Sequence, residues 1–412
     1  MLVPKLYTLD DIDVGNKKVL VRVDFNVPID VNGNILDDFR IRAHSQTLLS
    51  LLNRGAAVVV LSHQGRPGDS DFVTLENHAK KLEEVLGVEV RFVNDVMGPA
   101  ACEAIQSLRH GEILLLDNVR LVSEELMEGE PERLAKTYLV RRLAPHFNYF
   151  VFDAFATAHR AQPSIVGFPA VLPSVIGYVM KRELEALDRL LSKGSLKVFV
   201  LGGAKVKDMI KVVELLAKKG IECKVITAGL VGLVFHVAKG GKVSNSISKL
   251  LEERGLAPLI AEAKKVLSLG IPIETPYDAK VLKADGSIAE EPLSSATGIP
   301  LDIGSYTASV FSEIIRSASV VVMKGTAGRV EDPRFRSGTI ALLEAALKSS
   351  AYVVIGGGHI SSMLSEVGVV REKGIHISTA GGALLMALAG EELPALKALE
   401  LSYKRFFKVV PS

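Results

Sequence analysis

Short hydrophobic runs rich in β-branched residues recur along the chain and alternate with stretches of helical spacing. Five lie in the first half, at 17–25, 55–63, 88–93, 111–118 and 148–155, and five in the second, at 195–203, 222–229, 318–325, 351–358 and 374–380. Nearly continuous runs of this length are typical of parallel strands that helices cover on both faces. Their alternation with helices predicts an α/β fold built from open, doubly wound sheets.

Two sets of five strands indicate two lobes rather than one very wide sheet, and ten strands do not suit an eight-stranded barrel. Between the sets, the segment 180–194 places four leucines on one helical face and ends at Gly194, which predicts a connecting helix. The preceding residues 173–177 (PSVIG) are a candidate flexing point, and we expect residues 284–300, the longest polar interruption, to be a loop that forms a surface excursion.

The charge of the whole chain is nearly balanced. Its 412 residues carry a formal net charge of +2, which argues against a nucleic-acid-binding or membrane-surface protein, so any basic site must be local. The cysteines Cys102 and Cys223 lie far apart in no metal-binding motif, as expected in a reducing compartment. The N-terminal segment lacks a signal-peptide pattern, and no apolar run approaches the roughly 20 residues that span a bilayer. We therefore expect a cytoplasmic protein.

The strand ends of the first half are polar and basic. In open α/β sheets ligands bind beyond the carboxyl ends of the strands. The side chains expected there are Asp24, Asn26, Arg40, Arg42, His63, Arg66, Asp117, Asn118, Arg120, Asp153, His159 and Arg160. Guanidinium groups pair bidentately with phosphate and carboxylate oxygens, so five arginines at one sheet edge predict a site for a small polyanion.

The strand ends of the second half are rich in glycine instead. The clusters are Gly202–Gly203 with Lys205, Gly356–Gly358, and Thr379 with Gly381 and Gly382. Glycines let backbone N–H groups approach phosphate oxygens, and the N-termini of the following helices favour negative charge. Three clusters, one with a lysine beside it, predict a nucleotide phosphate site. A basic lobe and a glycine-rich lobe together suggest phosphoryl transfer between two small molecules.

Several common motifs are absent from the chain. It contains no GxxxxGK[ST] phosphate loop, no GxGxxG after the first strand, no GxSxG elbow and no HExxH helix. A NAD-dependent oxidoreductase on the same kind of sheet would need the dinucleotide fingerprint, so this alternative is weak.

Seven segments resemble the signatures of the phosphoglycerate kinase family, in that family's order. They are VLVRVDFNVP, SHQGRP, LLLDNVR, DAFATAHRAQPS, LGGAKVKD, IGGGH and ISTAGGA, and the match spans nearly the whole chain. The resemblance implies two Rossmann-like doubly wound parallel-sheet lobes joined by a central helix. The implied ranges are a phosphoglycerate lobe at 1–178 with the tail 393–412 packed back on it, a hinge helix at 179–195 and a nucleotide lobe at 196–392.

The resemblance also implies residue roles. Asp24 and Asn26 resemble the residues that hold the glycerate hydroxyl and carboxylate, and Arg40 resembles the catalytic arginine. His63, Arg66, Arg120 and Arg160 are similar to the set that anchors the non-transferring phosphate, with Phe25, Gln64 and Gly65 in the same substrate motifs. For the nucleotide, the implied residues are Gly203, Lys205, Glu331, Gly357, Gly358, His359, Ile360, Thr379, Gly381 and Gly382. Lys205 resembles the second catalytic residue.

In the implied reaction, 1,3-bisphosphoglycerate and Mg-ADP give 3-phosphoglycerate and ATP by lobe closure and in-line transfer. Family members are expected to act as monomers, without nucleic-acid or membrane partners.

The second lobe departs from the common family pattern. Met209 stands where many members have a second lysine, and His359 where many have an aspartate that contacts the metal–nucleotide complex. Asp208 is the remaining carboxylate that we expect near Mg²⁺, and Lys324 is a candidate for the missing positive charge. The histidine in GGGH resembles the archaeal branch. These departures leave one further alternative open, a protein that keeps the fold and binds ligands without turnover.

Overall fold

The computed structural model describes residues 6–192, 194–357, 360, 363–367, 374–380, 384, 387 and 392–407. By packing, the chain forms two compact units. Unit 1 contains Met1–Glu185 and Glu392–Ser412, and unit 2 contains Ala186–Glu391. The division lies within helix α6 (Tyr178–Leu191), the helix that the leucine spacing predicts. The assignment of the predicted ranges to substrate and nucleotide stays a prediction.

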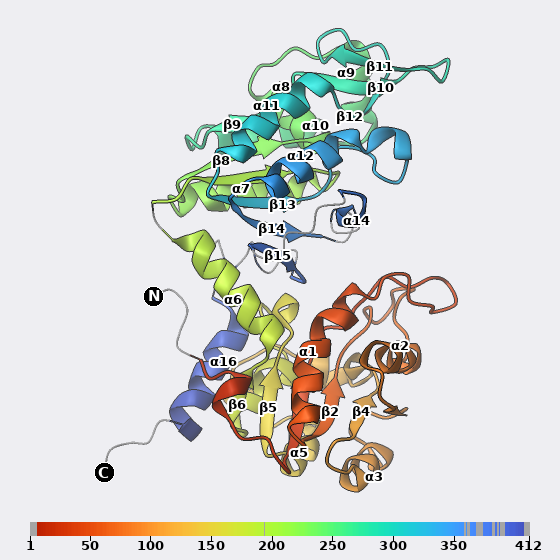
Figure 1. Ribbon diagram of the computed structural model, residues 1–412, viewed down its shortest axis with the longest axis vertical. Helices are drawn as coiled ribbons and strands as arrows, with labels where there is room; N and C mark the ends of the chain where they lie inside the picture. Colours follow the sequence, from red (N-terminus) through yellow and green to blue (C-terminus); the bar gives the residue numbers. More distant parts are fainter. Residues whose placement is uncertain are drawn as a thin grey trace. The chain divides into compact units, whose positions relative to one another are not determined.

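Unit 1 is built on a six-stranded sheet in the order β3-β4-β2-β1-β5-β6, and every pairing in it is parallel (Figure 1). The strands are β1 (Lys18–Arg22), β2 (Ala57–Leu61), β3 (Val90–Val93), β4 (Ile113–Leu116), β5 (Tyr149–Phe152) and β6 (Ser174–Ile176). Five of them lie within predicted runs. The interpretation of 173–177 as a flexing point missed β6, which is the edge strand beside β5. Its three residues are too few for a periodic signal.

Most helices of unit 1 contact strands of this sheet. They are α1 (Phe39–Asn53), α2 (Glu76–Leu86), α3 (Pro99–Ser107), α4 (Pro131–Leu134), α5 (Tyr138–Leu143) and α16 (Pro394–Ser402). Helix α1 buries Ile41, His44, Leu48 and Leu51, the spacing of one helical face. Helix α16 follows unit 2 in the chain but packs on β6, where the Ser402 hydroxyl accepts a 2.9 Å hydrogen bond from the backbone N–H of Ser174.

Unit 2 contains a second six-stranded parallel sheet, in the order β15-β14-β13-β7-β8-β9. Its strands are β7 (Lys197–Leu201), β8 (Cys223–Thr227), β9 (Ile273–Glu274), β13 (Val320–Lys324), β14 (Tyr352–Gly356) and β15 (Ile375–Ser378). Its helices are α7 (Val206–Lys218), α8 (Gly229–Ala238), α9 (Asn245–Glu253), α10 (Ala257–Leu267), α11 (Ser305–Arg316), α12 (Ser337–Lys348) and α14 (Leu364–Val367). Helices α7, α8 and α10 contact one another, as do α11 and α12, so helices cover the sheet in two groups (Figure 1).

The prediction that residues 284–300 are a loop is wrong. Strand β11 (Ile288–Pro292) lies inside this segment, and β12 (Ile299–Ile303) begins in it. Together with β10 (Asp278–Leu282) they form a three-stranded antiparallel sheet in the order β11-β10-β12. The outer strand β11 has no fully buried residue, and therefore it lacks the hydrophobic run that marks the other strands.

The predicted α/β fold of two doubly wound parallel sheets is confirmed, and the order of each sheet fixes where a ligand can bind. The strand order reverses beside β1 in unit 1 and beside β7 in unit 2. At such a reversal the two neighbouring connections leave toward opposite faces, which opens a crevice at the carboxyl ends of the strands. The residues that follow β1 and β7 are therefore the first to consider for function.

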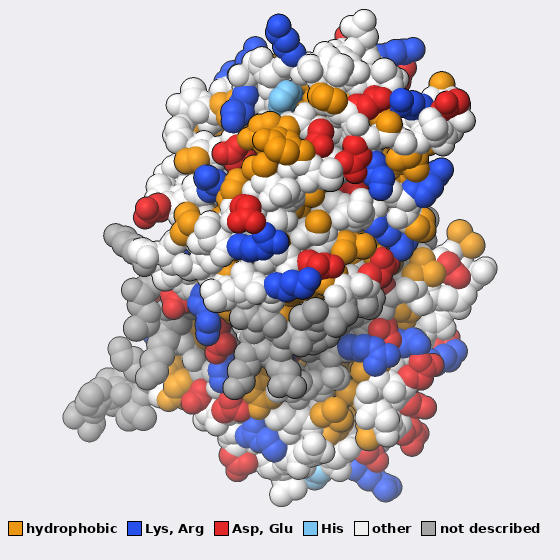
Figure 2. Space-filling model, turned by 45° about the horizontal axis from the view of Figure 1, so that its top comes forward, with side chains coloured by type: hydrophobic (Ala, Val, Ile, Leu, Met, Phe, Trp, Pro, Cys, Tyr) orange, Lys and Arg blue, Asp and Glu red, His pale blue; other side chains and the backbone are white. Residues whose placement is uncertain are grey.

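Among the described residues, no helix combines the length and apolarity needed to cross a bilayer. On the face seen in Figure 2, Lys and Arg side chains are interspersed with Asp and Glu side chains. The described part of this face thus carries mixed charge, in keeping with the formal net charge of +2.

Candidate functional site

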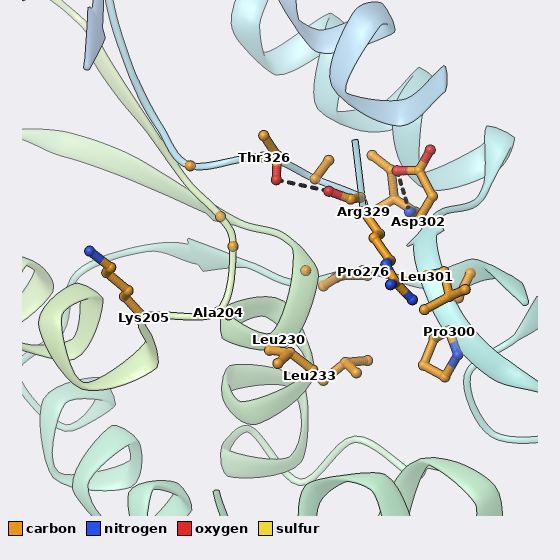
Figure 3. Close-up of a pocket in the computed structure, with 18 of the residues that line it drawn as sticks. Ala204, Lys205, Leu230, Leu233, Pro276, Pro300, Leu301, Asp302, Thr326 and Arg329 are labelled. Carbon is orange, nitrogen blue, oxygen red and sulfur yellow. Dashed lines mark hydrogen bonds between the residues drawn. The ribbon is translucent and has the colours of Figure 1, made fainter. Parts of the chain in front are cut away.

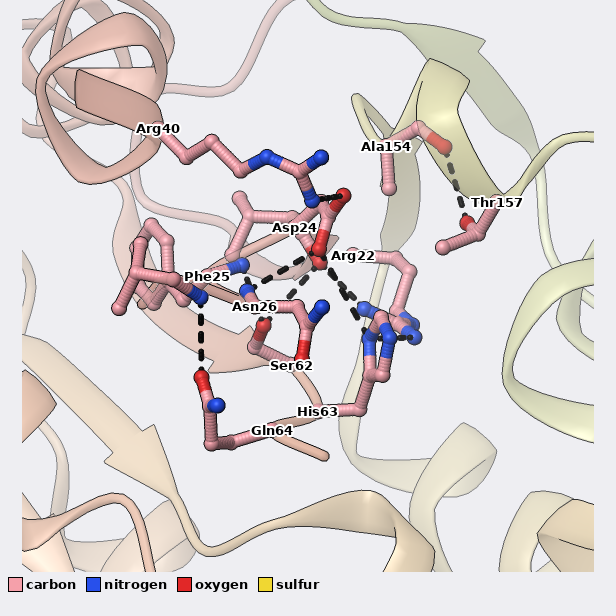
Figure 4. Close-up of polar contacts among 12 residues, drawn as sticks. Arg22, Asp24, Phe25, Asn26, Arg40, Ser62, His63, Gln64, Ala154 and Thr157 are labelled. Carbon is pink, nitrogen blue, oxygen red and sulfur yellow. Dashed lines mark hydrogen bonds and ion pairs between the residues drawn. The ribbon is translucent and has the colours of Figure 1, made fainter. Parts of the chain in front are cut away.

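In unit 1, Asp24 lies at the centre of the polar network beyond β1 (Figure 4). Asp24 is 2% exposed, and its Oδ2 atom accepts a 2.6 Å hydrogen bond from Arg40. Behind it, the backbone N–H of Asp24 donates to Nε2 of His44 at 3.2 Å, and Nδ1 of that ring lies 2.9 Å from Asp153. Because Nε2 accepts, the proton of His44 is on Nδ1, where the carboxylate of Asp153 accepts it. Two buried side chains thus position Asp24: Asp153, which was expected at this sheet edge, and His44, which the sequence reasoning missed.

The loop after β2 is fixed by backbone contacts. The side chain of Asn26 accepts a 2.8 Å hydrogen bond from the N–H of Gly65. Gly65 has a φ of +64°, and a Cβ there would lie 2.5 Å from the backbone of Asp71, so only glycine fits. Gln64 is fully buried and accepts the N–H of Val27 at 2.9 Å. Gln64 and Gly65 therefore shape the loop, while Asn26 links it to β1.

Arg66, Arg120 and Arg160 follow different strands of unit 1 and lie close enough to repel one another. Burial first, and then the charges of Arg160, Arg22 and Arg66, lower the pKa of Arg120 to about 10. The pKa of Arg160 is also lowered, first by burial, while Asp24 opposes the shift. Its NH1 atom is buried without a hydrogen-bond partner among the described residues. Cations held together with an unsatisfied donor form a site prepared for an anion.

His63 contacts Arg22, a residue that the sequence reasoning missed. Arg22 is 1% exposed at the end of β1, and its NH2 atom lies 3.2 Å from Nδ1 of His63 (Figure 4). Burial first, and then the charges of Arg22, Arg120, Arg160 and Arg40, hold the pKa of His63 well below 6.5. His63 is therefore neutral near pH 7. A charged residue inside a hydrophobic strand was the available signal for Arg22, because a buried cation requires partners.

The remaining predicted residues of unit 1 include three that do not face the cluster. Arg42 lies apart from it: its guanidinium forms a two-pronged pair with Asp38 on the exposed side of α1. Phe25 is fully buried, and its ring packs edge-on to His44. Asp117 caps the start of α2 through Thr74 and Leu75.

A pH effect on stability is expected from His78, which lies behind the loop of Gln64. Burial lowers the pKa of His78 to about 4, and its Nε2 lies 3.2 Å from Oε1 of Gln64. In the unfolded chain the ring titrates near 6.5, so the unfolded state binds more protons between pH 6.5 and 4. We expect the free energy of unfolding to fall by about 3 kcal/mol from this group as the pH drops through that window.

Urea denaturation at pH 4 to 7.5 measures this loss. The variant His78→Gln, which keeps a donor for Gln64, should lose less stability over the same range than the wild type. Equal losses in both proteins would contradict the assignment to His78.

In unit 2, a cavity of about 720 Å³ opens beyond the ends of β7 and β13. This volume suits a nucleotide-sized ligand. The loop after β7 contributes Gly202, Gly203 and Lys205, the last residue of β13 is Lys324, and the loop after β13 contributes Gly325. A Cβ on Gly202 would lie 2.3 Å from the carbonyl oxygen of Thr326, so the close approach of the two loops requires glycine.

The two sides of this cavity differ in chemistry (Figure 3). Lys205 lies on one side, at the N-terminal end of α7, where free backbone N–H groups and the helix dipole favour an anion. The other side is mainly apolar and includes Leu230, Leu233, Pro276, Pro300 and Leu301, with Arg329 beside Leu301. Apolar residues from α8 and β12 carry no sequence motif, and the sequence reasoning missed this side. Phosphates suit the first side and a nucleobase the second.

The predicted nucleotide residues are only partly covered by the structure. Gly203, Lys205, Glu331, Gly357 and Ile360 line the cavity. Thr379 is buried, and it follows β15. The predictions for Gly358, His359, Gly381 and Gly382 lie outside the described residues.

The departures from the family pattern in unit 2 also have structural positions. Met209 is 2% exposed and lines the cavity, whereas Lys207 is exposed on α7 and does not line it. Lys324 lines the cavity too, and burial lowers its pKa while the charge of Asp208 opposes that shift. Asp208 therefore lies near enough to Lys324 to act on its charge.

No group of three or more metal-binding side chains occurs within the described parts of the chain. Mg²⁺ commonly binds through one or two carboxylates together with substrate phosphates and water, so a complete cage is not required. Asp208, exposed in the first turn of α7 and acting on Lys324, fits such a site.

Comparison with known proteins agrees with this arrangement. The family model described as phosphoglycerate kinase matches residues 9–391. The phosphoglycerate kinase of Saccharolobus solfataricus is 51% identical over 396 residues, which cover 96% of this chain and 97% of the relative. That of Aeropyrum pernix is 48% identical, with 98% of each chain covered. The crystal structure of phosphoglycerate kinase from Pyrococcus horikoshii OT3 has a TM-score of 0.89 at 40% identity, covering 97% of this chain and 100% of the other.

Proposed function

Since the chain belongs to the phosphoglycerate kinase family, we propose that unit 1 binds the phosphoglycerate and unit 2 the nucleotide. The reaction itself is that of the family: phosphoryl transfer between 1,3-bisphosphoglycerate and ADP, giving 3-phosphoglycerate and ATP, in glycolysis and gluconeogenesis. The chain is thus a phosphotransferase with a carboxyl group as acceptor.

The basic cluster of unit 1 is the proposed phosphoglycerate site. The observation that carries this proposal is the set of mutually repelling, partly buried guanidinium groups, with an unsatisfied donor on Arg160. His63, Arg66, Arg120 and Arg160 would anchor the non-transferring phosphate. Asp24 and Asn26 would hold the glycerate hydroxyl and carboxylate, next to Phe25, Gln64 and Gly65.

The cavity of unit 2 is the proposed nucleotide site. Its Lys205 and Lys324 side suits the phosphates, and its apolar side suits the base. Gly203, Gly357 and Ile360 would lie along the nucleotide with Thr379 near them, and Glu331 would contact the ribose. Gly358, His359, Gly381 and Gly382 keep the nucleotide-binding role that the family resemblance implies. Mg²⁺, with Asp208 as its candidate carboxylate, would supply charge neutralisation on the phosphates.

Arg40 is the proposed catalytic residue of unit 1, and Lys205 that of unit 2. Phosphoryl transfer needs alignment of the reacting oxygens and stabilisation of charge on the moving group. Arg40 and Lys205 supply that positive charge, together with the backbone N–H groups at the start of α7. A general base is unnecessary, because the attacking oxygen of the nucleotide is already ionised.

The transfer joins molecules held by different units, so the units must close on each other during the reaction to align the oxygens and exclude water. Each proposed site draws its residues from one unit of one chain, which supports a monomer as the working form. Participation in glycolysis supports a cytoplasmic location. We propose no nucleic-acid or membrane partner.

Calorimetry with paired variants tests the division of labour. Arg160→Ala should weaken 3-phosphoglycerate binding about 10- to 100-fold, because a hydrogen bond to a charged group is lost, and leave ADP binding unchanged. Lys205→Ala should do the reverse. Equal weakening of both ligands by either variant would contradict separate sites.

A further inference from the structure

A chain of four buried side chains lies behind the basic cluster of unit 1. The carboxylate of Glu125 accepts hydrogen bonds from the hydroxyl of Ser164 at 2.6 Å and from its backbone N–H at 2.9 Å. The same hydroxyl accepts from Nε of Arg22 at 2.9 Å, and NH2 of Arg22 lies 3.2 Å from Nδ1 of His63. None of the four is more than 2% exposed. This row of hydrogen-bonded side chains begins at Glu125, which has no proposed contact with the substrate, and ends at His63, which has one.

The protons in this chain can be assigned from the donors available. Ser164 has one hydroxyl proton, which goes to the Glu125 carboxylate, and its lone pair accepts from Arg22. Arg22 can only donate, and its NH1 group donates to the carbonyl of Val23. Nδ1 of His63 must therefore accept from Arg22. Asp24 is 3.9 Å from the same nitrogen, which is too far for a hydrogen bond.

This assignment fixes the tautomer of His63. A neutral imidazole whose Nδ1 accepts carries its proton on Nε2. No described residue is hydrogen-bonded to Nε2 of His63, and the neighbouring charges are Arg22, Arg40, Arg120 and Arg160. The ring therefore has an N–H group available to an anionic ligand, without adding a fifth positive charge.

Glu125 and Arg22 also balance each other's charge. Burial raises the pKa of Glu125 and lowers that of Arg22, and each of the two charges opposes the shift of the other. If the carboxylate were absent, Arg22 would be a buried cation close to Arg160, with only Asp24 left to oppose its charge. A buried ion pair contributes little net stability, but removing one partner destabilises the protein strongly, because the other charge is left buried and unpaired.

We propose that Glu125 is a positioning residue for the substrate site: through Ser164 it holds Arg22, and Arg22 fixes His63 as the Nε2–H tautomer that donates to the substrate phosphate. The role of His63 at the substrate rests on the proposed function. A purely structural ion pair would stabilise the fold without setting the tautomer or favouring one substrate over the other.

Two readouts separate these cases. In protein labelled with ¹⁵N-histidine, the ring nitrogens of His63 report its tautomer, and His63→Gln identifies its signals among the nine histidines. Steady-state kinetics give the KM values for 3-phosphoglycerate and ATP. The variants are Glu125→Gln, Ser164→Ala and, as the matched control, Glu124→Gln, whose carboxylate accepts the backbone N–H groups of Tyr138 and Leu139 instead.

We expect a single Nε2–H tautomer near pH 7 in the wild type and in Glu124→Gln. Glu125→Gln and Ser164→Ala should show mixed tautomers and a rise of at least 10-fold in the KM for 3-phosphoglycerate, with the KM for ATP within twofold. If Glu125→Gln does not fold, Ser164→Ala decides, because it keeps both charges.

Unchanged His63 signals in folded Glu125→Gln and Ser164→Ala would overturn the proposal, as would equal rises in both KM values. If His63→Gln leaves the KM for 3-phosphoglycerate unchanged, the role of His63 in the proposed function fails. The nuclear magnetic resonance signals, recorded without substrate, still test the link from Glu125 to the tautomer.

Discussion

Replacing Arg40 with alanine should lower the turnover number by about 10²- to 10³-fold, with a much smaller effect on the KM for either substrate. Arg40 lies near the start of α1, and its guanidinium donates to Asp24 while 29% of its side chain remains exposed. One donor is thus anchored and the others are free to meet charge that develops on the moving phosphoryl group. A loss confined to turnover identifies an interaction made chiefly in the transition state.

Arg42→Ala is the matched control for this experiment. Arg42 lies on the same helix, but its guanidinium is paired with Asp38 at the surface. The Arg42→Ala variant should retain a turnover number close to that of the wild type. A turnover number within a few-fold of wild type in Arg40→Ala would rule out the catalytic role.

Replacing Lys324 with methionine should lower the turnover number by about 100-fold. Lys324 ends β13, and its carbonyl accepts a 2.8 Å hydrogen bond from the N–H of Gly202 in the opposite loop of the cavity. It is a partly buried cation on the cavity wall, and Met209, which lines the same cavity, is neutral. We therefore expect Lys324 to supply the charge that many family members place at the position of Met209.

Lys207→Met controls for the loss of one lysine, since Lys207 is exposed on α7 away from the cavity lining. Met209→Lys in the Lys324→Met background should recover part of the lost turnover. Unchanged turnover in Lys324→Met would leave Lys205 as the only lysine with a proposed catalytic role, and the account of the departure at Met209 would be wrong.

Most of the sheet architecture was predictable because the strands are buried on both faces. All five residues of β2 and of β7 are buried, so their sequences are continuous hydrophobic runs. The strands that escaped prediction are either exposed or very short. Strand β11 alternates between exposed and intermediate positions, and β6 and β9 contain three and two residues. Their pairing depends on neighbouring strands, which a local pattern does not record.

The site was predictable where residues follow strands directly. Asp24, Arg120 and Lys205 come immediately or closely after β1, β4 and β7. The supporting residues His44, Glu125 and Ser164 come from α1 and from short helical segments, and only folding brings them together. Met209 and Lys324 could not be paired from the sequence either. They lie far apart along the chain, and only the structure shows that both line one cavity.

The two alternative functions differ in what supports them. Membership of the phosphoglycerate kinase family excludes the NAD-dependent oxidoreductase. A protein that binds both ligands without turnover has Met209 and His359 in its favour. Arg40, Lys205 and the cavity lysine Lys324 argue for an active enzyme.

The most direct test of the central claim is a coupled assay. Purified protein is mixed with 3-phosphoglycerate, ATP and Mg²⁺ in the presence of glyceraldehyde-phosphate dehydrogenase, and the loss of NADH is recorded. We predict turnover that is nearly abolished in Arg40→Ala. No turnover from protein that still binds 3-phosphoglycerate and ADP by calorimetry would contradict the claim, and would identify a binding protein that has lost phosphoryl transfer.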